Sequence, residues 1–273
     1  METEIIILFC IIDDYLRAND YKDNVQSTMS TAEIMTIAVS AGLFFGGNHE
    51  KSRIFFIEHH YVHSMLSKSQ FNRRLHTVPE YIWYQLQCIL GQAFIQANDT
   101  QEYLVDSFPV AVCQNIRISR SKIYRAEKYR GYCASKREYF YGIRVHMVCT
   151  IKQEPIELIF APGSIHDLMV FREFDLDLPE ESKIYTDSAN TDYEYEDMLQ
   201  ESAHLKLFAA RKENSKRKRS PWVEFLIQHA RKKVETSISR ITSLFPKKIH
   251  AVTAKGFELK VFCFILAYSI SLL

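Results

Sequence analysis

Glu102-Tyr103-Leu104-Val105-Asp106 is a short apolar run that ends in a carboxylate, and Lys183-Ile184-Tyr185-Thr186-Asp187 repeats the pattern further along the chain. Each run has the composition of a buried strand. A carboxylate beside such a strand is costly unless it is paired or binds a metal ion. The plainer explanation is that Asp106 forms a turn at a strand end, and that Asp187, with Ser188-Ala189-Asn190 after it, forms an Asx turn or helix N-cap.

A third acid, Glu235, lies in a long helical pattern that Ser220 caps and Pro221 opens. The apolar residues of this helix form one predicted buried stripe, made of Val223, Ile227, Val234, Ile238 and Ile241. Arg231, Glu235 and Thr242 share a face next to that stripe. Glu235 could simply face solvent, but three convergent carboxylates would supply the oxygen ligands that Mg²⁺ prefers.

The order of the predicted elements brings the three acids together. From residue 102 onward the pattern predicts strand, strand, strand, helix, strand, helix, strand, helix. Three antiparallel strands followed by two strands added through helical crossovers form the mixed sheet of a ribonuclease-H-like α/β fold. In that fold Asp106, Asp187 and Glu235 would converge. Asp167 is the main competitor for an acidic role, and we expect it instead to cap the helix that follows it.

The sequence pattern of residues 1–98 predicts helices throughout. Ser30 and Glu33 form a predicted capping box, and Gly46-Gly47-Asn48 ends the helix that they begin. The pattern changes at Asn98. We therefore expect an all-helical N-terminal domain over residues 1–98, for DNA binding, dimerisation or a purely structural role. A catalytic domain would follow over residues 99–273, with a basic insertion at residues 110–138.

Charge is unevenly distributed although the net charge is only +1. Residues 110–138 carry 8 Lys and Arg against 2 Asp and Glu, and residues 211–219 carry 6 against 1. Such blocks suit contact with a polyanion, although each alone could be an ordinary solvated surface. The candidate DNA-binding residues are Arg117, Arg120, Lys122, Arg125, Lys128, Arg130, Lys216, Arg217, Lys218, Arg219, Arg231, Arg240 and Lys247, and Tyr124, Tyr129 and Tyr132 suit base stacking.

The spacing of the cysteines and the residues at both ends of the chain indicate in which compartment we expect the protein. The six cysteines include no C-x-x-C pair, which favours free thiols over disulfides or structural zinc. The acidic start Met1-Glu2-Thr3-Glu4 differs from a secretory signal, and the apolar run Val261–Leu273 is too short to span a bilayer. We expect a cytoplasmic protein with no membrane partner.

The motifs around the three acids resemble those of the DDE transposases of bacterial insertion sequences. Asp106 lies in Tyr-Leu-Val-Asp-Ser, Asp187 in Tyr-Thr-Asp-Ser-Ala-Asn and Glu235 in Arg-Lys-Lys-Val-Glu-Thr. Further similar stretches are Tyr141–His146, Pro162–Asp167, His250-Ala251, Lys255–Glu258 and Ile265–Tyr268. Some relatives carry a Tyr where this chain has Gln228 and a Lys where it has Thr242. How flipped or hairpin DNA ends would be handled is therefore left open.

The resemblance implies metal-dependent cleavage and strand transfer on DNA. Asp106, Asp187 and Glu235 would hold two Mg²⁺ ions, for which Mn²⁺ could substitute. The implied partners are the double-stranded ends of the element, target DNA and a second copy of the chain on DNA, in a bacterial, nucleoid-associated setting. Two alternatives remain open at this point: a ribonuclease-H-like nuclease or junction resolvase without strand transfer, and a catalytically inactive DNA-binding descendant.

Overall fold

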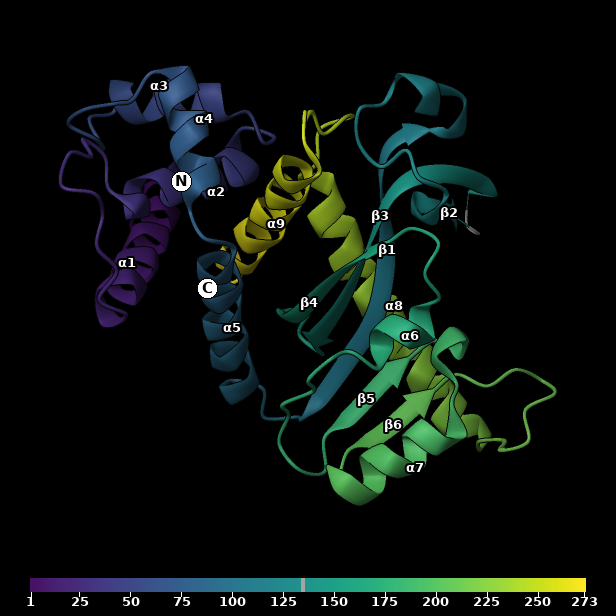
Figure 1. The fold of residues 1–273 in the computed structure, drawn as a ribbon. Helices are drawn as coiled ribbons and strands as arrows, with labels where there is room; N and C mark the ends of the chain where they lie inside the picture. The colour runs from purple at the N-terminus through teal and green to yellow at the C-terminus, as the bar shows by residue number, and fades with distance from the viewer. Residues whose placement is uncertain (134–135) are drawn as a thin grey trace. The chain divides into compact units, whose positions relative to one another are not determined.

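The computed structural model describes residues 1–133 and 136–273, and divides them into two compact units. The helical unit contains Met1–Ile89 together with Arg240–Leu273, and the sheet unit contains Leu90–Ser239 (Figure 1). Residues 240–273, assigned above to the catalytic domain, thus belong to the same compact unit as the N-terminal helices. Residues 134 and 135 of the predicted basic insertion lie outside the described residues.

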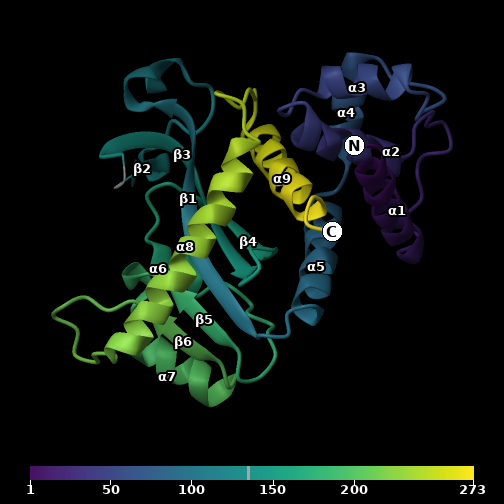
Figure 2. The ribbon, with the colours of Figure 1, turned by 180° about the vertical axis from the view of Figure 1, so that it is seen from behind.

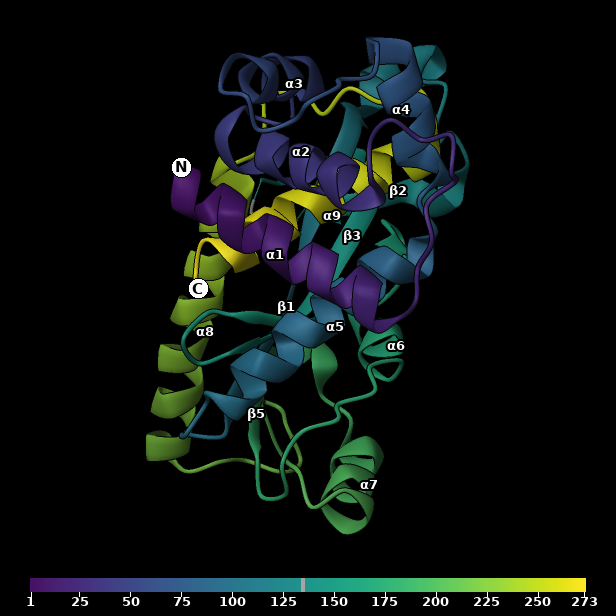
Figure 3. The ribbon, with the colours of Figure 1, turned by 90° about the vertical axis from the view of Figure 1, so that its left-hand side faces the viewer.

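The helical unit is organised around α2 (Thr31–Phe44), most of whose residues are buried. The predicted capping box is present, because Ser30 and Glu33 exchange their side-chain and backbone hydrogen bonds. Helix α2 packs against α1, α3, α4 and α9, and Figure 3 shows α1 and α2 side by side. The other helices are α1 (Glu2–Ala18), α3 (His49–Glu58), α4 (Lys68–Thr77), α5 (Glu80–Gln96), which continues into the sheet unit, and α9 (Ala254–Ile270).

Helix α9 contains the C-terminal apolar run. Every residue from Val261 to Ile270 is buried, so this run forms a core helix. Across the described ranges, no helix combines the length and the apolar character needed to cross a membrane.

The sheet unit contains one mixed sheet built around β3. On one edge β3 pairs with β1, which continues in parallel to β5 and then β6. The opposite edge is shared, because β2 pairs with residues 138–141 of β3 and β4 pairs with residues 143–149. This arrangement confirms the predicted α/β fold. The strands are β1 (Glu102–Gln114), β2 (Arg130–Cys133), β3 (Glu138–Thr150), β4 (Pro155–Pro162), β5 (Lys183–Thr186) and β6 (Lys206–Ala209).

Helices cover both faces of this sheet. Helices α6 (Asp167–Phe171) and α7 (Tyr193–Ser202) lie on the face toward the viewer in Figure 1, and α8 (Pro221–Ser243) crosses the other face in Figure 2. Ile227, Val234 and Ile241 of the predicted stripe on α8 are buried. The apolar periodicity of α8 therefore identified the side that packs inward.

Two expectations about the strands were wrong. Strand β1 runs for 13 residues, so Asp106 lies within the strand instead of at its end. The segment predicted as a basic insertion, residues 110–138, contains the end of β1, the strand β2 and two short 3₁₀ helices, η1 (Asn115–Arg120) and η2 (Glu127–Tyr129). Because this segment is rich in basic and aromatic residues, its sequence did not predict that β2 pairs with the start of β3.

The close approach of β1 and β3 depends on Gly142. A Cβ atom at this position would lie 2.2 Å from the backbone oxygen of Val110. We expect Gly142→Ala to lower the free energy of unfolding by about 2 kcal/mol, because two paired strands must separate. Urea denaturation measures the effect. Gly46→Asn is the control, since Gly46 has open space around it and Asn tolerates its φ of +55°. A Gly142→Ala protein as stable as the wild type would contradict this explanation.

Candidate active site

The strand register places Asp106 and Asp187 beside each other. Leu104 of β1 pairs with Tyr185 of β5 in a parallel ladder, Asp106 lies two residues further along β1, and Asp187 lies two residues after Tyr185, just past the end of β5. Side chains two residues apart return to the same face, and neighbouring strands are about 4.8 Å apart. The two carboxylates therefore share one face of the sheet at the end of β5.

In each of these carboxylates, one oxygen accepts a hydrogen bond from a nearby backbone N–H. Asp106 Oδ1 accepts a hydrogen bond from the Ser107 backbone N–H at 2.7 Å. Asp187 Oδ1 accepts one from the Ala189 N–H at 2.9 Å and caps η3 (Ser188–Asn190). Asp187 thus does form the local cap that its sequence suggested. Within the described part of the chain, no hydrogen bond reaches Oδ2 of either residue, so each acid keeps an oxygen for a further ligand.

The surroundings of Asp106 resist its ionisation. Burial, with a smaller contribution from the charge of Asp187 and against the hydrogen bond from Ser107, raises the pKa of Asp106 to about 6. Arg231 of α8 acts in the opposite direction. A half-buried carboxylate that faces another carboxylate is unfavourable for the fold by itself. It suits a site where a cation binds, and this donor set fits a hard divalent metal ion.

The raised pKa predicts how stability depends on pH. A carboxyl group whose pKa is higher in the folded state than in the unfolded state stabilises the fold at low pH. That stability is lost as the pH rises from about 4 to about 6. We expect Asp106→Asn to be more stable than the wild type at pH 7 without metal, by about 1–2 kcal/mol, and to show little difference at pH 4. Urea unfolding at both pH values measures this. A variant less stable than wild type at pH 7 would contradict it.

Glu235 lies on α8, one helical turn after Arg231, and its side chain is exposed. The helix covers the face of the sheet to which Asp106 belongs, because the next residue, Ser107, bonds to Asp167 of α6 on the opposite face. Among residues 1–133 and 136–273, however, no three His, Cys, Asp or Glu side chains are arranged to hold a metal ion. The structure therefore brings Asp106 and Asp187 together, and the participation of Glu235 stays a prediction.

Asp167 does not cap α6, contrary to expectation. His166 is the N-cap, and its Nδ1 accepts from the Leu168 N–H at 3.3 Å. Asp167 instead accepts a hydrogen bond from Ser107 Oγ at 3.1 Å, and lies 3.8 Å from both Arg144 Nε and His146 Nδ1. The local sequence suggested a cap because it contains no sign of these distant partners.

Asp167 belongs to the opposite face of the sheet from Asp106. Ser107 pairs directly with His146, whereas Asp106 pairs with Met147, and successive strand residues face opposite sides. The buried His146 has its pKa lowered to about 4, chiefly by burial, although Asp167 opposes that shift. The group of Ser107, His146 and Asp167 thus ties α6 to the sheet behind the site.

In the basic insertion, some cationic side chains have partners within the protein, and others are exposed to solvent. Arg130 pairs with Glu127 at 2.9 Å and lies 4.4 Å from the centre of the Tyr139 ring. Arg125 donates to the backbone oxygen of Ser121. The remaining candidates in this segment, Arg117, Arg120, Lys122 and Lys128, are exposed. Base stacking by Tyr124 is excluded in this conformation, because the residue is buried, with only 5% of its surface exposed.

The second basic segment, residues 211–219, is anchored on α7. Arg217 makes two bonds to Asp197, at 2.6 and 2.8 Å, and Arg219 donates to the backbone oxygen of Leu207 at 2.8 Å. Lys216 and Lys218 are exposed, and within the described residues no ion pair involves either side chain. These two lysines are therefore the candidates in this segment that are available to a ligand. Outside both segments, Arg240 and Lys247 are also exposed.

An aromatic ladder at the start of α8 was not anticipated. Trp222 and Phe225 are 66% and 57% exposed, and their rings stack with centroids 5.7 Å apart. His229 continues the stack at 6.3 Å from Phe225. The spacing of three and four residues could have revealed this face, because such residues are neighbours on a helix.

Comparison with known proteins agrees with this arrangement. A protein family described as "Transposase DDE domain" matches residues 96–249, a range that includes Asp106, Asp187 and Glu235. A solved structure described as a piggyBac transposase synaptic complex with hairpin DNA has a similar fold, with a TM-score of 0.51 at 11% sequence identity. That similarity covers 98% of this chain and 74% of the other. No curated protein gives a significant sequence match. Because the family match spans more than half of the sequence and includes all three acids, the chain belongs to the transposase DDE domain family.

Proposed function

We propose that this protein is the transposase of an insertion sequence, which binds the ends of its element and catalyses metal-dependent DNA cleavage and strand transfer. The observation that carries the proposal is the pair of Asp106 on β1 and Asp187 just after the adjacent strand β5, each with one oxygen left for a ligand. Membership of the transposase DDE domain family supports it.

Asp106, Asp187 and Glu235 are the residues that would hold two Mg²⁺ ions, with Mn²⁺ as the expected substitute. When bound, such ions activate the attacking hydroxyl and stabilise the leaving oxygen in phosphoryl transfer. The strands hold two of the acids in place, and α8 presents the third. Arg231 would offset part of the negative charge at Asp106.

DNA would contact the exposed cations. Arg117, Arg120, Lys122 and Lys128 would contact the backbone from the insertion, and Lys216 and Lys218 from the second basic segment. Arg125, Arg130, Arg217 and Arg219 already have internal partners and would contribute charge from fixed positions. The exposed Trp222 and Phe225 would stack on bases, since base–aromatic stacking tolerates any sequence. Arg231, Arg240 and Lys247 complete the proposed set.

Both ends of an element must be held together for excision, so the active form would be a homodimer on DNA. The helical unit is proposed to recognise the ends or to pair the two copies. Target DNA would be the third partner.

The direct test incubates the full chain with DNA that flanks its own gene, in Mg²⁺ and separately in Mn²⁺. Cleavage at the ends followed by joining of a 3′-hydroxyl to target DNA would support a transposase. Cleavage without joining would favour the nuclease or resolvase alternative. Binding without cleavage in either metal would indicate an inactive descendant.

The proposed role of the insertion gives a further prediction. Reversing Arg120, Lys122 and Arg125 to Glu should weaken DNA binding and flatten its salt dependence, with a loss of about 0.9 in the log–log slope for each phosphate contact. Fluorescence anisotropy across a salt series measures the slope. The matched control reverses Arg172, Lys183 and Lys206, which are already held in ion pairs by acids. Equal slopes for the two triple variants would show that the insertion does not contact DNA.

A further inference from the structure

A cationic pocket of about 360 Å³ lies within the helical unit, which contains neither Asp106 nor Asp187. Its wall combines two distant segments of the chain, residues 46–72 and residues 246–264. The basic side chains that line it are His49, Lys68, Lys248, His250 and Lys260. Of these positions, none belongs to the candidate DNA-binding residues identified from the sequence.

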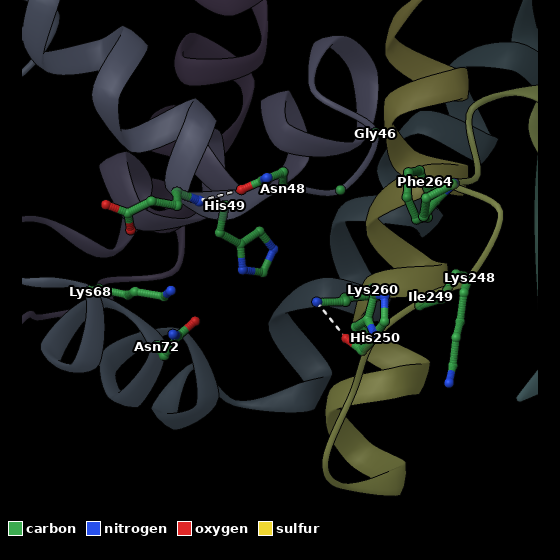
Figure 4. Close-up of a pocket in the computed structure, with 13 residues that line it drawn as sticks. Gly46, Asn48, His49, Lys68, Asn72, Lys248, Ile249, His250, Lys260 and Phe264 are labelled. Atoms are coloured by element: carbon green, nitrogen blue, oxygen red, sulfur yellow. Dashed lines mark hydrogen bonds between the residues drawn. The ribbon is translucent and has the colours of Figure 1, made fainter.

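The side chains approach the pocket from two sides (Figure 4). His49 at the start of α3 and Lys68 and Asn72 of α4 point inward from one wall. Lys260 of α9 points inward from the other wall, where its Nζ donates to the backbone oxygen of His250 at 2.6 Å. Lys248 lies beside this wall. The arrangement leaves space between opposing cationic groups, which a single anionic group could occupy.

Acidic residues do not neutralise the lysines of this pocket. Of the described lining residues, Glu50 is the one acid, and it pairs with Arg53 at 2.5 Å. No ion pair among the described residues involves Lys68, Lys248 or Lys260. Burial lowers the pKa of Lys260, and burial together with Lys260 lowers the pKa of His49 to about 4. A partly desolvated ammonium without a counter-charge is unfavourable, and an anion would relieve that cost.

We propose that this pocket binds a phosphate group of the DNA backbone. The inference rests on the proposed function and adds a DNA contact in the helical unit. Lysine provides a point charge that suits a phosphate without fixing its orientation. Lys68, Lys248 and His250 are exposed at the surface, so a phosphate that is part of a long polymer can approach them. The site requires both chain segments, so it exists only when residues 246–264 are folded against the N-terminal helices.

The experiment uses the full chain and a short DNA duplex of arbitrary sequence, with binding measured by fluorescence anisotropy across a salt series. We expect Lys68→Gln, Lys248→Gln and Lys260→Gln each to reduce the log–log slope by about 0.9, which corresponds to roughly eightfold weaker binding at about 0.1 M salt. Lys260→Arg should keep most of the affinity, because it keeps the charge. Lys22→Gln, an exposed lysine outside the pocket, should bind like the wild type.

The outcomes separate this site from the proposed function. Wild-type affinity and slope in all three glutamine variants would overturn the pocket, while DNA binding by the protein would stand. Absence of DNA binding by the wild type would overturn both. A thermal-shift titration with inorganic phosphate adds a third arm: saturable stabilisation that depends on Lys260, with unchanged DNA slopes, would assign the pocket to a small free anion and overturn the DNA contact. The exposed Lys68 and Lys248 keep the test valid if Lys260→Gln fails to fold.

Discussion

Asp106→Asn and Asp187→Asn should each reduce DNA cleavage by on the order of a thousandfold or more, equivalent to a barrier increase of about 4 kcal/mol. Asparagine keeps the size of the side chain but loses the negative charge that a divalent ion requires. Each residue would also keep an oxygen able to accept its backbone hydrogen bond, from Ser107 or Ala189. The fold should therefore persist, and the loss should be confined to chemistry.

Cleavage of end DNA in Mg²⁺ measures the loss, and anisotropy with the same DNA measures binding. We expect the affinity of both variants to stay within about threefold of the wild type, because removing a negative charge does not weaken contact with a polyanion. Asp177→Asn, which changes an exposed acid in the same unit, is the control and should cleave normally. Near-normal cleavage by either the Asp106 or the Asp187 variant would remove that residue from the site.

The sequence predicted the strands β1, β3, β4, β5 and β6 in their order along the chain, and the positions of most helices, because the apolar periodicity there is strong. It did not predict the length of β1. Pro109 discourages the assignment of a strand, since proline cannot donate to a ladder. In the structure β5 pairs with β1 only as far as Leu104, so the edge of β1 beyond that point has no parallel neighbour. Proline is tolerated there, and Asp106 lies inside a strand that continues to Gln114.

The sequence also could not show which charged residues are occupied by partners. Arg211 and Arg217 look alike in a basic run, yet Arg211 is buried against Glu196 at 2.5 Å and Arg217 is held by Asp197. Their partners, Glu196 and Asp197, lie on α7, which precedes the basic run in the chain. The pocket in the helical unit was hidden for the same reason, because Lys68 and Lys260 are far apart in sequence.

Glu235→Gln and Asp167→Asn should have opposite effects, and together they identify the third acid. We expect Glu235→Gln to lower cleavage by on the order of a hundredfold or more, with unchanged stability. We expect Asp167→Asn to keep cleavage within about tenfold but to lower the free energy of unfolding by about 1–2 kcal/mol. Helix α8 covers one face of the sheet, and Asp167 lies on the other face with Ser107, Arg144 and His146.

Cleavage assays and urea denaturation on both variants give the two readouts. Asp177→Asn again serves as the control for loss of an exposed charge. We expect Glu235, and not Asp167, to act together with Asp106, because Asp167 is held by Ser107 on the other face of the sheet. If Asp167→Asn abolished cleavage without loss of stability, and Glu235→Gln cleaved normally, the assignment of α8 to the active site would be wrong. In that case His146 and Asp167, and not Arg231 and Glu235, would mark the catalytic face.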